Sequence, residues 1–88
     1  MTAKVEIYSS PFCGYCARAK GLLSRKGVDY TDYDIMVDPS KRDEMLERAG
    51  GLTSVPQIFI DNAHIGGCDE LLALEQQGRL DPLLKPVG

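Results

Sequence analysis

The stretch SSPFCGYCARAK (residues 9–20) places two cysteines three positions apart, at the junction between two patterns that predict different structures. Before it, KVEIY (4–8) alternates apolar and polar residues, which is typical of a strand. After it, apolar residues recur at the spacing of one helix face: Tyr15, Cys16, Ala19, Leu22 and Leu23. Lys26 and Gly27 are residue types often found where a helix ends. The sequence therefore predicts a strand, a turn that carries Cys13, and a helix that ends near Gly27.

Farther along the chain, turn residues separate the remaining apolar segments. The sequence predicts a strand over 28–35, a helix over 40–50, strands over 57–60 and 63–65, a helix over 68–77, and a final helical turn and tail over 80–88. Asp38 is the expected N-cap of the second helix and Pro39 its first residue, where the missing N–H of proline has no intrahelical partner to lose. Asp61 and Asn62 both tolerate left-handed backbone, so they suit a tight hairpin.

This order of elements, β-α-β-α-β-β-α, defines the expected fold class. The first two strands are joined through a helix, so we expect them to be parallel, in a right-handed crossover. The hairpin over 57–65 adds an antiparallel edge. We therefore expect an α/β fold with a central four-stranded mixed sheet and helices on both of its faces. The chain has 88 residues and no repeat or linker, so residues 1–88 are expected to form one domain.

Composition argues against several classes of function. Hydrophobic residues make up 43% of the chain and charged residues 26%, which is typical of a globular protein. No apolar run approaches the roughly 20 residues of a membrane span, so we expect no membrane partner. MTAKVEIY (1–8) lacks a basic start followed by an apolar stretch, so we expect no secretory signal and a cytoplasmic location. The net charge of −3 argues against nucleic acid as a partner, and three cysteines argue against a disulfide framework.

Charge is distributed unevenly around the cysteine pair. Residues 9–28 contain no acid but four basic residues: Arg18, Lys20, Arg25 and Lys26. Residues 29–38, in contrast, contain four acids and no base. A charge run of this kind is often a solvated helix face. Because this one coincides with two thiols, we interpret it as an environment that favours a negatively charged sulfur.

The cysteine spacing indicates a site of thiol–disulfide exchange. The thiolate is the form that attacks a disulfide, and the first turn of a helix favours negative charge through its free N–H groups and its dipole. Cys13 lies just before the predicted helix, so we expect it to be accessible and nucleophilic. Cys16 lies one turn farther in and is expected to be less accessible. The spacing lets Cys16 reach Cys13 and release a bound thiol by closing a small disulfide ring.

Two alternatives remain open for this pair. Half of a zinc site has the same C-x-x-C spacing, and His64 and Cys68 are candidates for the other half. They lie far from Cys16 in the sequence, and His64 falls in a predicted strand, where we expect it on the hairpin surface. An inert structural pair is the second alternative, although such thiols seldom lie at a basic helix start. A C-x-x-C beside a βαβ pattern favours the redox interpretation.

TSVPQIFI (53–60) provides a second signal, because Pro56 begins a predicted strand. Proline restricts the preceding Val55 to extended backbone, which leaves the N–H and C=O groups of Val55 available to a chain that lies alongside. A tight turn is where a cis X-Pro bond is used, although the frequencies of proline isomers alone favour a trans bond.

Three motifs in order resemble the glutaredoxin family, specifically its small dithiol class. They are C-G-Y-C (13–16) after the first strand, S-V-P (54–56) before the third, and G-G-C-D (66–69) before the last long helix. The resemblance extends from Val5 to Lys85. It implies a thioredoxin-like fold, the activity of a glutathione-dependent thiol–disulfide oxidoreductase, and glutathione as electron donor and co-substrate.

The resemblance also implies roles for individual residues. Cys13 matches the family's nucleophile and Cys16 its resolving cysteine. Tyr15 matches the aromatic residue beside the cysteine of bound glutathione. Val55 matches the residue whose backbone pairs with that cysteine in a short β-like contact, and Pro56 matches the family's cis-proline.

The other glutathione-binding residues that the resemblance implies come from three segments. Ser54 stands where the family commonly has threonine, so the hydroxyl is retained. Gly67, Cys68 and Asp69 match the segment that receives the γ-glutamyl end, where backbone N–H groups bind its carboxylate and Asp69 pairs with its amine. We interpret Cys68 as a packed residue rather than a third redox thiol. Arg42 matches a position that contacts the glycine carboxylate.

Two residues depart from the family pattern. Gly14 stands where the common active site has proline, and Ser10 lies near where many members carry lysine. The missing lysine removes one cation near Cys13, so the thiolate is either less favoured or compensated by Arg18 or Lys20. Glycine or serine after the nucleophile resembles members that carry an iron–sulfur cluster. This leaves open the alternative of a [2Fe–2S] carrier, in which two chains share the cluster through Cys13 and two glutathiones.

These assignments define the expected function and partners. We expect an enzyme that reduces glutathione mixed disulfides and protein disulfides by attack of the Cys13 thiolate. Its partners are glutathione and glutathionylated or disulfide-containing proteins. Glutathione is anionic overall, so the basic residues around the cysteine pair should attract it. The chemistry needs no metal, and we expect a monomer unless a cluster is bound.

Overall fold

The computed structural model describes residues 3–85, in which the predicted order of elements is present and the predicted final helical turn forms a short helix; the end of the expected tail, 86–88, lies outside the described residues. The elements are β1 (Val5–Ser9), α1 (Gly14–Arg25), β2 (Thr31–Asp34), α2 (Pro39–Arg48), β3 (Gln57–Ile60), β4 (Ala63–Gly66), α3 (Cys68–Gln76) and α4 (Leu80–Leu84). Within these residues, no helix has both the length and the apolar character needed to cross a membrane.

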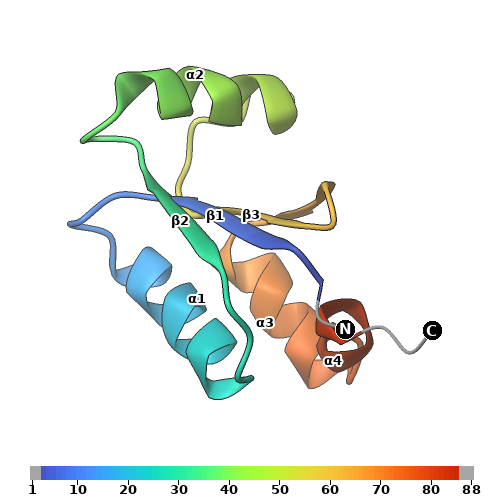
Figure 1. The fold of residues 1–88 in the computed structure, drawn as a ribbon. Helices are drawn as coiled ribbons and strands as arrows, with labels where there is room; N and C mark the ends of the chain where they lie inside the picture. Colours follow the sequence, from blue (N-terminus) through green and yellow to red (C-terminus); the bar gives the residue numbers. More distant parts are fainter. Residues whose placement is uncertain (1–2, 86–88) are drawn as a thin grey trace.

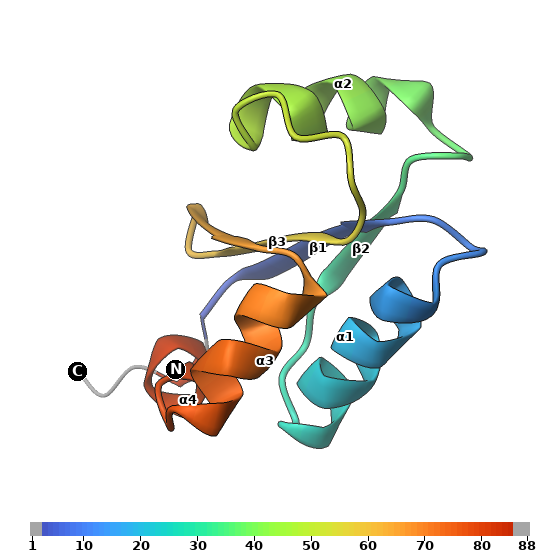
Figure 2. The same cartoon turned by 180° about the vertical axis from the view of Figure 1, so that it is seen from behind.

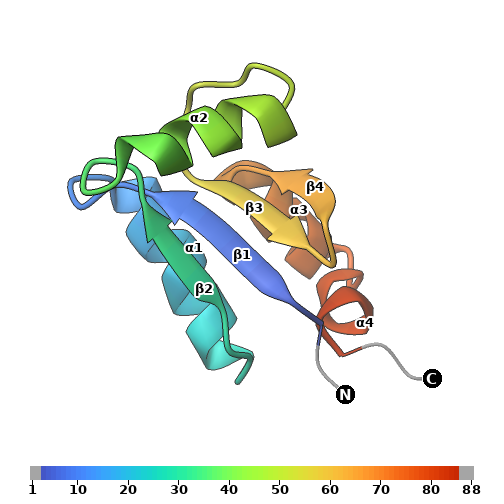
Figure 3. The same cartoon turned by 45° about the horizontal axis from the view of Figure 1, so that its top comes forward.

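The strands form one mixed sheet in the order β2-β1-β3-β4 (Figure 3). β1 is parallel to β2 and antiparallel to β3, and β3 and β4 form an antiparallel hairpin, so the predicted pairing is confirmed. In the register, Tyr8 of β1 lies between Tyr33 of β2 and Gln57 of β3. These directions bring the ends of β1 and β2 and the start of β3 to the same end of the sheet.

Helices cover both faces of the sheet, as the apolar pattern predicts. α2 lies alone on one face, whereas α1 and α3 lie side by side on the other, with α4 following α3 (Figures 1 and 2). Alternate residues of β1 serve the two layers. Val5 and Ile7 belong to the hydrophobic cluster beneath α1 and α3, and Tyr8 belongs to the cluster beneath α2.

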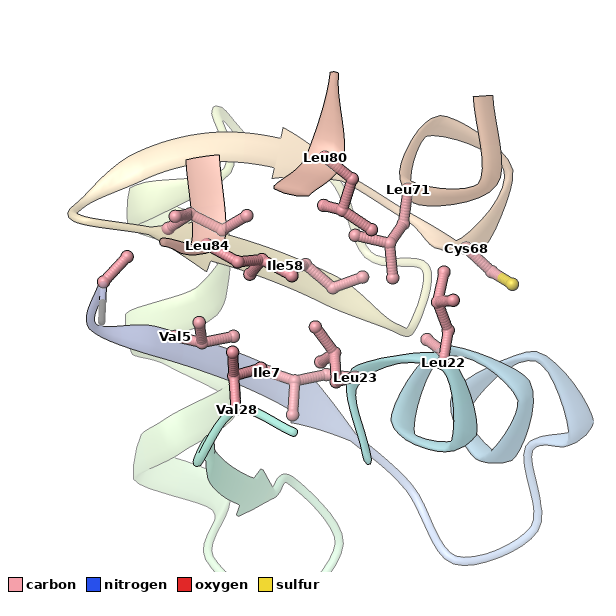
Figure 4. Packing of buried hydrophobic residues seen from close by; sticks show 13 residues of the cluster. Val5, Ile7, Leu22, Leu23, Val28, Ile58, Cys68, Leu71, Leu80 and Leu84 are labelled. Atoms are coloured by element: carbon pink, nitrogen blue, oxygen red, sulfur yellow. The ribbon is translucent and has the colours of Figure 1, made fainter. Parts of the chain in front are cut away.

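The face covered by α1 and α3 holds the larger core. Side chains from both helices meet those of the central strands (Figure 4), among them Leu22, Leu23, Leu71, Ile7 and Ile58. All of these are buried. Full burial of one such side chain contributes about 1.5–3 kcal/mol to stability, so this layer supplies most of the hydrophobic stabilisation.

The face beneath α2 combines a small apolar cluster with buried polar groups. Tyr8, Met45 and Phe59 are the largest members of the cluster. Arg48 of α2 donates to both carboxylate oxygens of Glu6, at 3.0 and 3.1 Å, and to the hydroxyl of Tyr8 at 2.8 Å. The hydrogen bonds from Arg48 hold the pKa of Glu6 below its usual value, against the opposing effect of burial. Polar bonds therefore hold α2 on the sheet together with packing.

Two turn predictions are confirmed. Asp38 is the N-cap of α2, where its Oδ1 accepts the N–H of Ser40 at 3.1 Å, and Pro39 is the first helical residue. In the hairpin between β3 and β4, Asp61 and Asn62 have φ angles of 49° and 67°. This left-handed conformation is the one that two-residue hairpin turns favour.

The second strand is shorter than the sequence predicts, because β2 covers Thr31–Asp34 rather than 28–35. β2 is an edge strand that pairs only with β1, whose last four residues it matches one for one. At its end, Asp34 Oδ1 accepts the N–H groups of Met36 at 2.9 Å and Val37 at 3.2 Å. The strand thus stops where its partner ends and where a side chain turns the backbone.

Candidate active site

Cys13 lies in the turn between β1 and α1, at the end of the sheet described above. It is the N-cap of α1, with an extended backbone (φ −118°, ψ 111°). Its Sγ accepts the N–H of Cys16 at 3.3 Å, one of the donors that a helix start leaves without an intrahelical partner. The side chain is half-buried. The start of α1 therefore contacts the sulfur directly, as the sequence predicts.

Cys16 lies one turn into α1 and is only 1% exposed. Burial, together with the neighbouring Cys13, raises the pKa of the Cys16 thiol to about 12, against the opposing effects of a backbone hydrogen bond from Ser10 and the charge of Lys20. Cys16 therefore carries its proton at neutral pH. The prediction that Cys16 is the less accessible of the two thiols is confirmed.

The segment before β3 reaches the same place. The Val55–Pro56 peptide bond is cis, as the resemblance implies and contrary to the frequencies of proline isomers. The Cys13 thiol donates to the backbone carbonyl oxygen of Val55, with 3.6 Å between sulfur and oxygen. The backbone of Val55 thus lies next to the Cys13 sulfur, and its pairing with the cysteine of glutathione stays a prediction.

A groove of about 260 Å³ opens beside these two segments. It is lined by residues from three parts of the chain: Tyr15 from α1, Ser54, Val55 and Pro56 from the segment before β3, and Gly67, Cys68, Asp69 and Glu70 at the start of α3. Seven of these eight residues are those to which the resemblance assigns glutathione. The structure thus brings residues that are distant in sequence to one depression beside Cys13.

Arg42 is the assigned residue that the structure does not bring to the groove. It is exposed on α2 and is not among the residues that line the depression. α2 covers the face of the sheet opposite to α1 and α3 (Figure 1). The assignment of Arg42 to the glycine carboxylate stays a prediction.

The start of α3 explains the two glycines that precede it. Gly66 has a φ of +117°, and a Cβ at this residue would lie 2.6 Å from Glu70 Oε1. The N–H of Gly67 donates to the same oxygen at 2.9 Å. Glu70 therefore belongs to the groove although the sequence analysis did not assign it; a glutamate at the third position of a predicted helix is a capping signal. The N–H groups of Cys68 and Asp69 have no acceptor among residues 3–85, so they are available to an anion.

Cys68 packs as the sequence analysis expects. It is buried with the larger core, and its sulfur lies at the margin of that cluster (Figure 4). Burial raises the pKa of the Cys68 thiol, and the charge of Arg18 acts in the opposite direction. A protonated, buried thiol is a poor nucleophile.

Lys20 lies near Cys16 and forms an ion pair with Asp32 of β2. Its Nζ lies 2.6 Å from Asp32 Oδ2, and the other carboxylate oxygen of Asp32 accepts the hydroxyl of Ser9 at 2.5 Å. Lys20 follows Cys16 by one helical turn, and its charge lowers the pKa of that thiol. Lys20 thus favours the thiolate of Cys16, and the expectation that Arg18 or Lys20 compensates at Cys13 stays a prediction.

His64 does not join the cysteines. Within residues 3–85, no three His, Cys, Asp or Glu side chains converge on a position for a metal ion. His64 is exposed on β4, its Nε2 lies 2.7 Å from Gln57 Oε1, and its ring stacks on Phe59 with centroids 5.0 Å apart. Gln57 donates in turn to Ser54 of the groove. No sequence pattern indicates a role for Gln57, because its partner His64 comes next to it only when β3 and β4 pair.

Comparison with known proteins identifies related chains. A model of the glutaredoxin family matches residues 5–65. Glutaredoxin 3 of Escherichia coli (strain K12) is 58% identical over 83 residues, which cover 94% of this chain and 99% of that protein. A glutaredoxin of Pseudomonas aeruginosa is 51% identical over 80 residues, which cover 91% of this chain and 94% of that protein.

Solved structures confirm the fold class. The solution structure of a glutaredoxin from Brucella melitensis has a TM-score of 0.81 at 52% identity, and the match covers 96% of this chain and 90% of that one. The crystal structure of a buckwheat glutaredoxin–glutathione complex has a TM-score of 0.84 at 30% identity, with coverages of 93% and 76%. The expected thioredoxin-like fold, with a four-stranded mixed sheet flanked by helices, is therefore confirmed.

Proposed function

This chain belongs to the glutaredoxin family and is a glutathione-dependent thiol–disulfide oxidoreductase; from that premise we propose that Cys13 is the nucleophile and Cys16 the resolving cysteine. The observation that carries the proposal is the difference between two thiols one helical turn apart. Cys13 is half-buried, accepts an N–H from the helix start and lies beside the groove. Cys16 is buried and keeps its proton at neutral pH.

For a glutathione mixed disulfide, the reaction has two steps. The Cys13 thiolate attacks the glutathione sulfur, the disulfide bond breaks, and the substrate leaves as a thiolate that takes a proton from water. Cys13 is then joined to glutathione. A second glutathione, as its thiolate, attacks the glutathione sulfur of this adduct and releases Cys13 as a thiolate. The net change converts one mixed disulfide and one glutathione into the free substrate thiol and oxidised glutathione.

For a protein disulfide, Cys16 takes part. Cys13 first forms a mixed disulfide with the substrate, and the Cys16 sulfur then attacks the sulfur of Cys13. The Cys13–Cys16 bond forms, the substrate leaves as a dithiol, and two glutathiones reduce the resulting disulfide. Because Cys16 is a thiol at neutral pH, it has to lose its proton as it attacks. Glutathionylated and disulfide-containing proteins are therefore the proposed substrates.

The groove is the proposed binding site of glutathione. The backbone of Val55 would pair with the cysteine of glutathione, with Tyr15 and Ser54 beside it. The free N–H groups of Cys68 and Asp69 would bind the γ-glutamyl carboxylate, and the Asp69 carboxylate would bind its amine. The similar buckwheat glutaredoxin is described as a glutathione complex, which supports this occupant.

Intact-mass measurement after mixing with oxidised glutathione tests the proposal. The Cys16→Ser variant is used because it cannot close the ring, so that the adduct is retained. We expect one glutathione per chain, and we expect peptide mapping to place it on Cys13. A variant that also carries Cys68→Ser is the control and should give the same adduct. Glutathione found mainly on Cys68 would contradict the proposal.

A [2Fe–2S] carrier is the alternative function. The alternative comes from Gly14, the residue after the nucleophile in members of the family that carry a cluster, and a Cβ at Gly14 would meet no atom within 4 Å. Both Cys16 and Cys68 are buried, so a cluster would need Cys13 from two copies and the thiolates of two glutathiones. Anaerobic reconstitution, followed by absorption spectroscopy and gel filtration, separates the two functions. A colourless monomer that turns over glutathione mixed disulfides would contradict the carrier as the main role.

A further inference from the structure

The side chain of Gln57 makes contacts that the reaction described above does not use. Gln57 is the first residue of β3, directly after Pro56, and it is only 2% exposed. Its Nε2 donates to the backbone carbonyl oxygen of Ser54 at 2.9 Å and lies 3.2 Å from the Ser54 hydroxyl. Its Oε1 lies 2.7 Å from Nε2 of His64 on β4. A buried carboxamide thus joins the segment before β3 to the edge strand.

The contacts determine the orientation of this carboxamide. The carbonyl oxygen of Ser54 can only accept a hydrogen bond, so the NH₂ group of Gln57 has to face Ser54. The Oε1 atom then faces His64, which has to carry a proton on Nε2. Both the neutral Nε2–H tautomer and the imidazolium have this proton. The network of His64, Gln57 and Ser54 therefore persists whether His64 is neutral or charged.

This network supports a segment that lies outside the helices and strands. Residues 52–56 belong to no helix or strand, although Ser54, Val55 and Pro56 line the groove. The backbone carbonyl of Ser54 is held by Gln57, whose own position is determined by the β1–β3 pairing. His64 is held in turn by its stacking on Phe59. The side chain of Gln57 thereby ties the backbone of Ser54, in the lining of the groove, to the sheet.

We infer that Gln57 and His64 are positioning residues for glutathione, which hold Ser54 and Val55 in the arrangement that the bound tripeptide requires. The inference rests on the proposed function of the groove. Among residues 3–85, the side-chain hydrogen bonds of Gln57 go to Ser54 and His64 and to neither cysteine, so we expect it to act on binding rather than on the exchange of disulfides. Loss of the network leaves the loop free to take other arrangements, of which only some fit glutathione.

Four variants separate this role from a general loss of stability. Gln57→Met keeps the length of the side chain and removes its hydrogen bonds. Gln57→Glu keeps the shape and the acceptor that faces His64 but removes both donors to Ser54. His64→Phe keeps the stacking on Phe59 and removes the donor to Gln57. Ile58→Val is the matched control, because it removes a buried methylene from the next residue of β3, on the opposite face of the sheet.

Two measurements are made on each variant. Steady-state turnover of the cysteine–glutathione mixed disulfide gives KM and kcat, and a chemical-shift titration with S-methylglutathione, which cannot react, gives the dissociation constant. We expect Gln57→Met and Gln57→Glu to raise both KM and the dissociation constant by about three- to tenfold, the size expected when one or two supporting hydrogen bonds are lost. His64→Phe should have a smaller effect in the same direction. In all three, kcat should change less than about twofold, because the cysteines are not altered.

The outcomes are distinguishable. KM and the dissociation constant unchanged in Gln57→Met would overturn the inference. An equal rise in Ile58→Val would also overturn it, because the effect would then follow stability alone. If the unaltered protein itself fails to turn over the mixed disulfide, the proposed function fails, and the S-methylglutathione titration still decides whether Gln57 shapes the groove.

Discussion

Cys13 and Cys16 are one helical turn apart, yet their surroundings give them opposite properties. The N–H of Cys16 points at the Cys13 sulfur, so the same turn of α1 that stabilises negative charge on Cys13 places the Cys16 side chain in the interior. Cys13 lies before the helix as its N-cap, where the first turn leaves N–H groups free to meet its sulfur, whereas Cys16 lies within α1 on the side that packs into the interior. One thiol is therefore prepared for attack, and the other is kept protonated until it is needed.

Substitution of each cysteine should separate the two routes. Cys13→Ser removes the nucleophile of both, so we expect no turnover above the uncatalysed rate. Cys16→Ser should keep turnover of glutathione mixed disulfides and lose reduction of protein disulfides, because only the second route needs ring closure. Both are measured by coupling the formation of oxidised glutathione to the oxidation of NADPH through added glutathione reductase, with the unaltered protein as the reference. Equal inactivity of Cys16→Ser on mixed disulfides would contradict the first route.

Alkaline pH should destabilise the reduced protein. The pKa of Cys16 is raised by burial from about 9 to about 12, and that of Tyr8 is raised, also mainly by burial, from about 10 to about 12. The folded state therefore holds protons that the unfolded chain gives up between pH 9 and pH 12. The stabilisation is complete below this window and is lost as pH rises through it, by up to about 1.4 kcal/mol per pH unit for each group.

Urea unfolding of the reduced protein at about pH 8, 9.5 and 11 measures this loss. We expect the free energy of unfolding to fall across the series and to fall less steeply in Cys16→Ser, which has no thiol to titrate at this position. Tyr8→Phe should likewise reduce the fall in the free energy of unfolding over this pH range. A series that is flat in the unaltered protein would contradict the burial of both groups.

The sequence predicts most groove residues, by two routes. Cys13 and Val55 follow from local patterns, a thiol at a helix start and a residue before proline, whereas the role of Asp69 is implied only by the resemblance to the family. Glu70 carries a local capping signal that the sequence analysis leaves unassigned, whereas the role of Gln57 depends on contacts. Gln57 meets its partners only after the hairpin has paired, and no spacing in the sequence shows which face of β3 it occupies.

At the scale of elements, α1 places the positive charge of Lys20 near Cys16, the thiol that closes the Cys13–Cys16 disulfide. Lys20 follows Cys16 by one turn and is held by Asp32 of β2. Its charge opposes the burial that raises the pKa of the Cys16 thiol. We expect Lys20→Met to slow closure of the Cys13–Cys16 ring by about three- to tenfold, because an uncompensated thiolate is harder to form. Stopped-flow release of glutathione from the Cys13 adduct measures this step.

A double variant shows whether this effect passes through Cys16. In the Cys16→Ser background, Lys20→Met should leave turnover of mixed disulfides unchanged, and Lys20→Arg should retain most of the closure rate in the unaltered background. Equal slowing by Lys20→Met in the absence of Cys16 would show that Lys20 acts elsewhere.

The helices and strands are predictable where local signals bound them. Asp38 and Pro39 mark the start of α2, and Asp61 and Asn62 mark the hairpin. The length of β2 is not predictable in this way. An edge strand is only as long as its pairing with β1, and that limit is a property of the neighbouring strand rather than of residues 28–35.

An ion pair between Arg48 and Glu6, buried at its Glu6 end, helps to hold α2 on the sheet. The Glu6 side chain is 5% exposed and that of Arg48 is 23% exposed. Arg48→Met leaves the Glu6 carboxylate buried without its partner, and we expect a loss of about 2–3 kcal/mol, reduced from the fully buried case because water reaches Arg48. Urea unfolding measures the loss. Adding Glu6→Gln should recover part of it; no recovery would mean that Arg48 acts through its packing on Phe59 instead.

For the molecule as a whole, the two faces of the sheet are held differently. Among the described residues, the cluster beneath α1 and α3 contains thirteen buried residues, and the cluster beneath α2 contains five. Hydrogen bonds from Arg48 to Glu6 and Tyr8, and from the Tyr8 hydroxyl to Glu44, supply the rest on the α2 side. Such bonds add little net stability compared with apolar burial. The molecule therefore has one strongly and one weakly attached layer.

Native-state hydrogen exchange should detect this asymmetry. We expect the free energy of opening to be lower for amides of α2 (Pro39–Arg48) than for amides of β1 and β3. The α2 opening should also depend less on urea concentration, because it exposes less surface. Added salt should lower the α2 value further by screening its ion pairs. Exchange of α2 and β1 at one common free energy would contradict the two-layer description.

Hydrogen exchange also tests the predicted contact between Arg42, which does not line the groove, and glutathione. Arg42 lies on α2, so a contact between Arg42 and the glycine carboxylate would couple glutathione to the weakly attached layer. In Cys16→Ser carrying glutathione on Cys13, α2 amides should become more protected, because a ligand that binds only the closed arrangement stabilises it. Arg42→Gln should remove this gain while leaving the protection of α3 amides near Asp69 unchanged. Equal protection with and without Arg42 would mean that glutathione is held by the groove alone.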